Sequence, residues 1–138
     1  MDNTLRGIVQ GIATDVRYWV EGRVKCPVDV VTLSGYCAIA SAELFRRLVG
    51  EGLKPEIHVW VCPNTNDAHV FVVVEDHVVD VTATQFKDFV GEIVVIMHSK
   101  EAERWEHWNS TSSFSSVKAL IKDQKKHKWP ADQVAYNS

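Results

Sequence analysis

A change in hydrophobic periodicity at Pro55 is the feature that most constrains the fold of this chain. Before Pro55, apolar residues recur at helical spacing over residues 4–21 and again over 36–52. After Pro55 the period becomes two, which is typical of strands. The strands expected are 56–62, 68–75, 78–82 and 92–97.

The expected strands are followed by two further helices, over residues 100–108 and 115–127, joined by a Ser/Thr-rich link at 110–116. This order predicts one α+β domain over residues 1–138, with N-terminal and C-terminal helices packed on an antiparallel sheet of about four strands. The strand 68–75 is apolar on both faces, which favours a central position in the sheet. Three tryptophans are expected to seal the C-terminal helices onto the core: Trp105, Trp108 and Trp129.

Polar residues are well placed to begin the first two helices. Thr4 is the expected cap of the first helix, and Ser34 is the expected cap of the second. The segment 22–35 between them is expected to be irregular, because Pro27 and Gly35 interrupt both kinds of periodicity.

Charge and hydropathy exclude several classes of protein. The 138 residues carry a formal net charge of -3, whereas a protein that binds nucleic-acid backbone needs a basic face. No stretch approaches the roughly 18 apolar residues of a membrane span. The N-terminus MDNTLRGIVQG lacks the apolar region of a secretory signal, and the 3 cysteines, an odd number, favour reduced thiols. We therefore expect a cytoplasmic protein that binds neither nucleic acid nor membrane.

Three residues have the chemistry of covalent acyl transfer. Cys37 lies at the start of the second helix, where unpaired backbone N–H groups and the helix dipole favour thiolate over thiol. His69 opens the strand 68–75, directly after the polar loop 63–67, and Asp80 lies on the next strand. A thiol nucleophile needs a histidine to take its proton and a carboxylate to orient the imidazole. We interpret these three residues as a catalytic set.

Each of these residues also has a plain structural interpretation. A lone cysteine is more often a small buried hydrophobe than a nucleophile, and His58 and His77 are rivals for the histidine. If Asp80 points to solvent on an exposed sheet face, Asp67 could take the third place. A zinc site is disfavoured because no C-x-x-C or H-x-x-x-H spacing occurs, and no cofactor is expected.

The expected hairpin register works against contact between His69 and Asp80. A tight turn centred on Asp76 and His77 places His69 opposite about position 84, not opposite Asp80. We therefore expect a bulge or a wider turn in this hairpin, which would bring the two side chains together.

A family resemblance supports this interpretation. Cys37 at a helix start, His69 within AHVFVVV and Asp80 within HVVDVTATQF resemble the papain-like superfamily, and within it the transglutaminase-like cysteine peptidases. The resemblance covers roughly residues 30–90. It implies a papain-like/transglutaminase-like core and thioester chemistry on a protein or peptide: peptide hydrolysis, glutamine deamidation or transamidation. In this pattern Cys37 is the nucleophile, His69 the general base and acid, and Asp80 the orienting group.

One departure from the family concerns the oxyanion hole. Papain-like peptidases usually carry a glutamine just upstream of the cysteine, whereas Thr32, Ser34 and Tyr36 precede Cys37 here. The expected donors are therefore the backbone N–H of Cys37 and a side chain such as Ser34 or Tyr36. The chain is also short for a full peptidase. The alternative is a catalytically silent binding domain of the same fold that contacts a partner protein.

Overall fold

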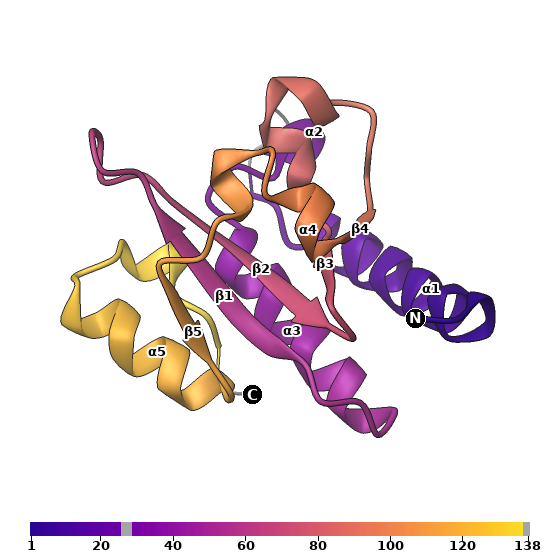
Figure 1. Cartoon of the computed structure of the whole chain (residues 1–138). Coiled ribbons are helices and arrows are strands. Elements are labelled where there is room, and N and C mark those ends of the chain that lie inside the picture. Colours follow the sequence, from indigo (N-terminus) through magenta and orange to yellow (C-terminus); the bar gives the residue numbers. More distant parts are fainter. Residues whose placement is uncertain (26–28, 137–138) are drawn as a thin grey trace.

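An antiparallel sheet with helices packed on it forms the core of the molecule, as the sequence predicts (Figure 1). The computed structural model describes residues 1–25 and 29–136. The helices are α1 (Asn3–Glu21), α2 (Asp29–Thr32), α3 (Cys37–Gly50), α4 (Ser99–Ala102) and α5 (Val117–Lys126). The strands are β1 (Glu56–Val61), β2 (Ala68–Val74), β3 (His77–Asp80), β4 (Val95–His98) and β5 (Ser112–Phe114). Their order in the sheet is β4-β3-β2-β1-β5, so β2 is the central strand, as its apolar sequence predicts.

One face of the sheet packs against α1 and α3. Val72 and Val79 on this face belong to the same core cluster as Val16 of α1 and Leu44 of α3. In Figure 1, α3 runs behind β1 and β2. Burial of each such aliphatic side chain stabilises the folded state by roughly 1.5–3 kcal/mol, so this layer holds the strands and α3 firmly in place.

The opposite face of the sheet is covered by the chain that follows β3. Phe71 and Val78 of the sheet pack there against Phe89 and Trp108. Side chains alternate between the two faces along a strand, which places His69 and Asp80 on this face together with Phe71. The two polar residues therefore lie at the edge of a second, largely aromatic cluster.

The caps of the first two helices differ from the predictions. Asp2, not Thr4, caps α1, because its carboxylate accepts a 2.8 Å hydrogen bond from the backbone N–H of Leu5. Ser34 does not cap α3. The chain turns through Leu33 and Gly35 with φ of 54° and 84°, which leaves Ser34 in the turn ahead of the helix.

Three segments also differ from the predicted elements. Residues Asp29–Thr32, expected to be irregular, form α2. The predicted helix 100–108 is only the short α4, followed by a 3-10 turn at Glu106–Trp108. The predicted link at 110–116 contains β5, which pairs with the free edge of β1 and so satisfies backbone groups that an edge strand leaves open. Pro27 and Cys26 lie outside the described residues.

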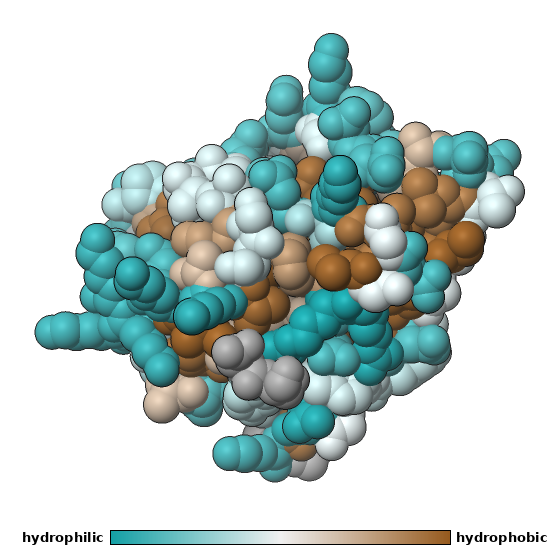
Figure 2. Space-filling model, turned by 90° about the horizontal axis from the view of Figure 1, so that it is seen from below, coloured by the Kyte–Doolittle hydropathy of each residue, from teal (hydrophilic) through white to brown (hydrophobic). Residues whose placement is uncertain are grey.

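The surface mixes hydrophobic and hydrophilic residues. Figure 2 shows hydrophobic side chains in separate patches among hydrophilic ones on the face seen from below. The most exposed apolar side chains, Tyr18 and Val31 at 60% each, belong to different helices. Within the described residues, no helix combines the length and the apolar character that a membrane crossing requires.

Candidate active site

A cleft opens at the end of the sheet where β1 stops and β2 starts. Its volume is about 1190 Å³. Its walls come from the turn before α3, the end of β1 with the loop into β2, the segment after β3, and the chain after α5. The lining residues include Ser34, Gly35, Cys37, Trp60, Asp67, His69, Gln85, Phe86, Trp129 and Gln133. Cys37 and His69 therefore share one cleft.

Cys37 is the first residue of α3. The backbone N–H of Ala40 donates a 2.9 Å hydrogen bond to the carbonyl oxygen of Tyr36, the residue before the helix. Among the described residues, the N–H groups of Cys37 and Ala38 have no bonded acceptor, as expected at a helix start. The Cys37 side chain is 4% exposed and packs beside Ala38, while it also lines the cleft. It is thus both a buried small side chain and part of the cleft wall.

His69 and Asp80 are in direct contact. Nε2 of His69 lies 2.6 Å from Oδ2 of Asp80, and both side chains are buried. This is the contact that the sequence interpretation requires between the two residues.

The prediction of a bulge or a wider turn in the hairpin was wrong. The turn consists of two residues, Glu75 and Asp76, with φ of 50° and 60°, as in a type I′ hairpin. The turn therefore lies one residue earlier than predicted, and Val72 pairs with Val79. Continued by one residue, this register puts Asp80 diagonally across from His69, which is within reach of their side chains.

The carboxylate of Asp80 is held from three sides. Besides His69, the indole N–H of Trp108 donates to Oδ2 at 2.8 Å and the backbone N–H of Thr82 donates to Oδ1 at 2.8 Å. Burial alone raises the pKa of Asp80, but the charge of His69 and these hydrogen bonds outweigh burial and lower it. Asp80 is therefore ionised. The sequence interpretation placed Trp108 only in the core, because its contact with Asp80 joins residues 28 positions apart.

The other ring nitrogen of His69 contacts Gln85, a residue that the sequence interpretation did not assign. Nδ1 lies 3.0 Å from Nε2 of Gln85, which is also 3.1 Å from the carbonyl oxygen of Thr82. A carbonyl oxygen only accepts, so the contact with Thr82 orients the amide and makes Gln85 a donor to Nδ1. The phrase TATQF after Asp80 was the available signal for this residue.

The environment of His69 favours its protonated form. Burial lowers the pKa of His69, but the charge of Asp80 and the hydrogen bond to it raise it, and the Cys37 side chain adds to this as a hydrogen-bond partner and as a charge. The net effect raises the pKa of His69 to about 9. Cys37 and His69 therefore influence each other electrostatically across the cleft that both line.

Aromatic rings shield the buried side of His69. Phe86 meets the His69 ring edge-on with centroids 4.8 Å apart, and His107 stacks on Phe86 at 3.7 Å. Burial, followed by the charge of His69, lowers the pKa of His107 to about 4, so this second histidine is neutral. Its Nε2 is buried without a hydrogen-bond partner among the described residues.

The two predicted oxyanion donors lie in different places. Ser34 lines the cleft. Tyr36 is not among the cleft-lining residues, because its hydroxyl turns away and accepts a 3.4 Å hydrogen bond from the backbone N–H of Lys25.

The rival residues have other partners. Nε2 of His58 lies 3.5 Å from a carboxylate oxygen of Glu56, and Nδ1 of His77 lies 2.8 Å from the carbonyl oxygen of Glu75. Asp67 lines the cleft, but its carboxylate accepts a 2.9 Å hydrogen bond from the hydroxyl of Thr65 in the same loop.

Cys62 is a second thiol near the cleft. It is half-exposed in the β1–β2 loop, and a hydrogen bond with the Thr65 side chain, followed by one with the backbone of Asn64, lowers its pKa. Within the described residues, no three His, Cys, Asp or Glu side chains form a group suited to a metal ion.

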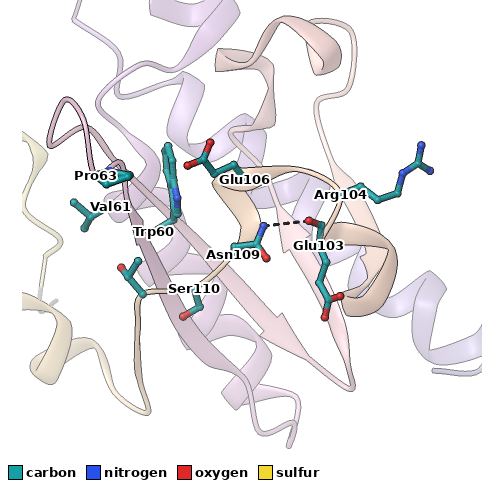
Figure 3. A pocket seen from close by; sticks show the side chains of 9 residues that line it. Trp60, Val61, Pro63, Glu103, Arg104, Glu106, Asn109 and Ser110 are labelled. Carbon is teal, nitrogen blue, oxygen red and sulfur yellow. Dashed lines mark hydrogen bonds between the residues drawn. The ribbon is translucent and has the colours of Figure 1, made fainter.

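A second hollow continues the cleft past Trp60. Its volume is about 570 Å³, and it shares Trp60, Val61 and Thr111 with the cleft. Figure 3 shows its floor, where the Asn109 amide donates a 3.2 Å hydrogen bond to the carbonyl oxygen of Glu103. Together the two depressions offer room for an extended chain on both sides of Trp60.

Comparisons with protein-family models, with curated proteins and with solved structures found no match for this chain. The chemistry that the site can support follows from its own residues: a thiol at a helix start, a buried imidazole bonded to a carboxylate, and the cleft that the thiol and the imidazole line.

Proposed function

We propose that this protein is a thiol-dependent amide hydrolase or acyltransferase with Cys37 as nucleophile. The observation that carries the proposal is the buried 2.6 Å contact between His69 and Asp80 beside the cleft that Cys37 lines. A buried histidine–carboxylate pair stabilises imidazolium, and imidazolium is the partner that a reactive thiolate needs. The resemblance to transglutaminase-like cysteine peptidases rests on the same three residues, Cys37, His69 and Asp80, and agrees with this proposal.

The proposed reaction has two halves. Nδ1 of His69 takes the thiol proton of Cys37, and the sulfur attacks the carbonyl carbon of an amide, whose electron pair moves to oxygen. When this intermediate collapses, the C–N bond breaks and His69 returns the proton to the departing amine. Water or a second amine then attacks the thioester while His69 removes its proton. The C–S bond breaks as the second intermediate collapses, the acid or new amide departs, and His69 returns the proton to the Cys37 sulfur. Asp80 keeps Nε2 protonated throughout, so Nδ1 always faces the reacting atoms.

The size of the cleft favours a protein or peptide substrate. Pockets for small ligands usually measure roughly 300–1,000 Å³, whereas this cleft measures about 1190 Å³ and continues into the hollow beyond Trp60. Hydrolysis, deamidation and transamidation share the first half-reaction and differ only in the amine that leaves and the group that attacks.

A second candidate is a catalytically silent binding domain of the same fold. The low exposure of Cys37, at 4%, favours this alternative, as does the hydrogen bond from Gln85 that occupies Nδ1 of His69. In this case the cleft would hold a partner segment without cutting it.

Alkylation of Cys37 by iodoacetamide separates the two candidates. Cys62 has a lowered pKa of its own, so the experiment uses a Cys62→Ser background and maps the labelled residue by mass spectrometry. The enzyme predicts alkylation of Cys37 in the folded protein well below about pH 8, because imidazole stabilises the thiolate. His69→Ala should slow this reaction, and the control His77→Ala should not.

The opposite result supports the binding domain. If Cys37 in the folded protein reacts no faster with His69 present than in His69→Ala at any pH between about 5 and 8, the two residues do not form a thiolate–imidazolium pair. The proposal of an acyl-transfer enzyme then fails.

A further inference from the structure

We propose that Gln133 is a catalytic residue of this site, whose side-chain amide hydrogen-bonds the oxyanion formed when Cys37 attacks a carbonyl. This inference rests on the proposed function and names a residue at a place in the chain that neither the sequence pattern nor the family resemblance indicates. Gln133 lies 96 positions after Cys37, in a 3-10 turn at Ala131–Gln133.

The first observation is the contact between Gln133 and Gly35. Gly35 has a φ of 84°, and a Cβ at this position would lie 3.2 Å from Nε2 of Gln133 and 3.5 Å from its Cδ. The side chain of Gln133 thus packs against Gly35, two positions before the nucleophile, where a larger residue would crowd it. Gly35, Cys37 and Gln133 all line the cleft.

The second observation is that the backbone of Gln133 is clamped. Gln124 of α5 is fully buried; its Nε2 donates to the carbonyl oxygen of Gln133 at 3.4 Å, and its Oε1 accepts from the N–H of Ala135 at 2.9 Å. Ala135 is 4% exposed and belongs to the core cluster of Cys37. A buried amide satisfied at both ends fixes the segment it bonds. Gln124 is therefore a positioning residue that ties the 3-10 turn to α5, while Ala135 packs in the same core cluster as Cys37.

The third observation is that two donors are free. Among the described residues, neither the backbone N–H of Cys37 nor the side-chain amide of Gln133 donates to an acceptor. A backbone N–H and a side-chain amide beside a nucleophile are the usual components of an oxyanion hole. The amide of Gln133 can fill the role that was expected of Tyr36, which does not line the cleft and whose hydroxyl accepts a hydrogen bond from Lys25.

The experiment compares two reactions of the same thiol in Cys62→Ser protein. Acylation by 4-nitrophenyl acetate passes through an oxyanion, whereas alkylation by iodoacetamide forms none. Gln133→Leu should slow acylation of Cys37 by roughly 100-fold and leave its alkylation rate unchanged. Gln10→Leu, on the exposed face of α1, is the matched control and should change neither rate.

A second pair of variants tests the position of the amide without removing it. Gly35→Ala should displace Gln133 and give the same selective loss of acylation. Gly52→Ala is its control, because Gly52 has nearly the same φ, 83°, with nothing within 4 Å of an added Cβ. Both substitutions carry the same backbone strain, but only the first disturbs the glutamine.

Three results would overturn the inference. Unchanged acylation in Gln133→Leu would show that the amide does not contact the oxyanion. Equal loss of acylation and alkylation would assign Gln133 a role in holding Cys37 or the fold. If the parent protein forms no acetyl adduct on Cys37 while the residue still alkylates, the proposed function itself fails, and the role of Gln133 falls with it.

Discussion

Nε2 of His69 and Oδ2 of Asp80 lie 2.6 Å apart, although the two residues are diagonal and not directly opposite neighbours across β2 and β3. The diagonal arises from the two-residue turn at Glu75 and Asp76. The buried Phe71 ring stacks on the His69 ring with centroids 5.9 Å apart, so an aromatic side chain lies beside the ion pair. This burial strengthens the electrostatic coupling of the pair and makes it sensitive to the loss of either member.

Replacing Asp80 with Asn should reverse the shift in the pKa of His69. Without the carboxylate charge, burial lowers the pKa of His69 from about 9 toward or below its usual value of 6.5. The raised pKa of His69 stabilises the folded state fully below pH 6.5, and this stabilisation is lost as pH rises through about 9. Asp80→Asn should therefore lower the free energy of unfolding by about 3 kcal/mol near neutral pH and by much less at alkaline pH. Urea unfolding over this pH range and the NMR titration of the His69 ring measure both effects.

Asp76→Asn is the control for this prediction, because Asp76 is exposed in the turn of the same hairpin. It should leave both the titration of His69 and the alkaline loss of stability unchanged. A His69 titration in Asp80→Asn that remains near pH 9 would contradict the assignment of Asp80 as the cause.

Replacing Gln85 with Leu should favour the thiolate–imidazolium pair of Cys37 and His69. A hydrogen bond from Gln85 to Nδ1 is possible only while Nδ1 carries no proton, so it favours neutral His69 and opposes the rise in pKa that Asp80 causes. The leucine removes the donor and leaves Nδ1 free for the thiol proton. The acid limb of the rate–pH profile for Cys37 alkylation should therefore move to lower pH, as measured with iodoacetamide in Cys62→Ser protein.

Gln10→Leu again serves as the control and should not move the profile. A shift of the Gln85→Leu profile to higher pH would mean that the amide oxygen faces Nδ1 and accepts a hydrogen bond from the imidazolium N–H. That outcome would reverse the role of Gln85 from a group that favours the neutral form of His69 to one that stabilises its charged form.

The elements that carry the site could be predicted from local sequence patterns. Helical periodicity located α3 and put Cys37 at its start, and the apolar sequence of β2 indicated the central strand that begins next to His69. The hairpin register could not be predicted, because shifting the turn by one residue changes every pairing in the hairpin by two positions. The distance between His69 and Asp80 depends on that shift.

The side chains that complete the site come from segments whose packing has no local signature. Trp108 and Gln133 reach the site only after the chain following β3 folds back over the sheet and α5 packs beside α3. Arg17 is a further example: it is 2% exposed on α1, and its guanidinium donates to the Val81 carbonyl oxygen at 3.1 Å and to Thr84 Oγ1 at 2.7 Å. A sequence pattern assigns such an arginine to the solvent-facing side of a helix.

His107 should make the protein lose stability in mild acid. Burial lowers its pKa from 6.5 to about 4 in the folded state, whereas the unfolded chain binds the proton near 6.5. Above pH 6.5 His107 is neutral in both states and costs no stability. As pH falls from 6.5 toward 4, the free energy of unfolding should decrease by up to about 3 kcal/mol because of this group. His69 adds nothing in this range, since it is protonated in both states below 6.5, and the lowered pKa of Asp80 costs stability only below 3.8.

His107→Phe tests this directly, because phenylalanine retains the stacking on Phe86 and does not titrate. The free energy of unfolding in urea, measured at about pH 7 and about pH 4.5, should fall less between the two values in His107→Phe than in the parent. His127→Gln, at an exposed position on the C-terminal side of α5, should behave like the parent. An equal acid loss in His107→Phe would mean that water or another group reaches Nε2 and lets His107 take a proton without unfolding, so that the aromatic shield around His69 is open.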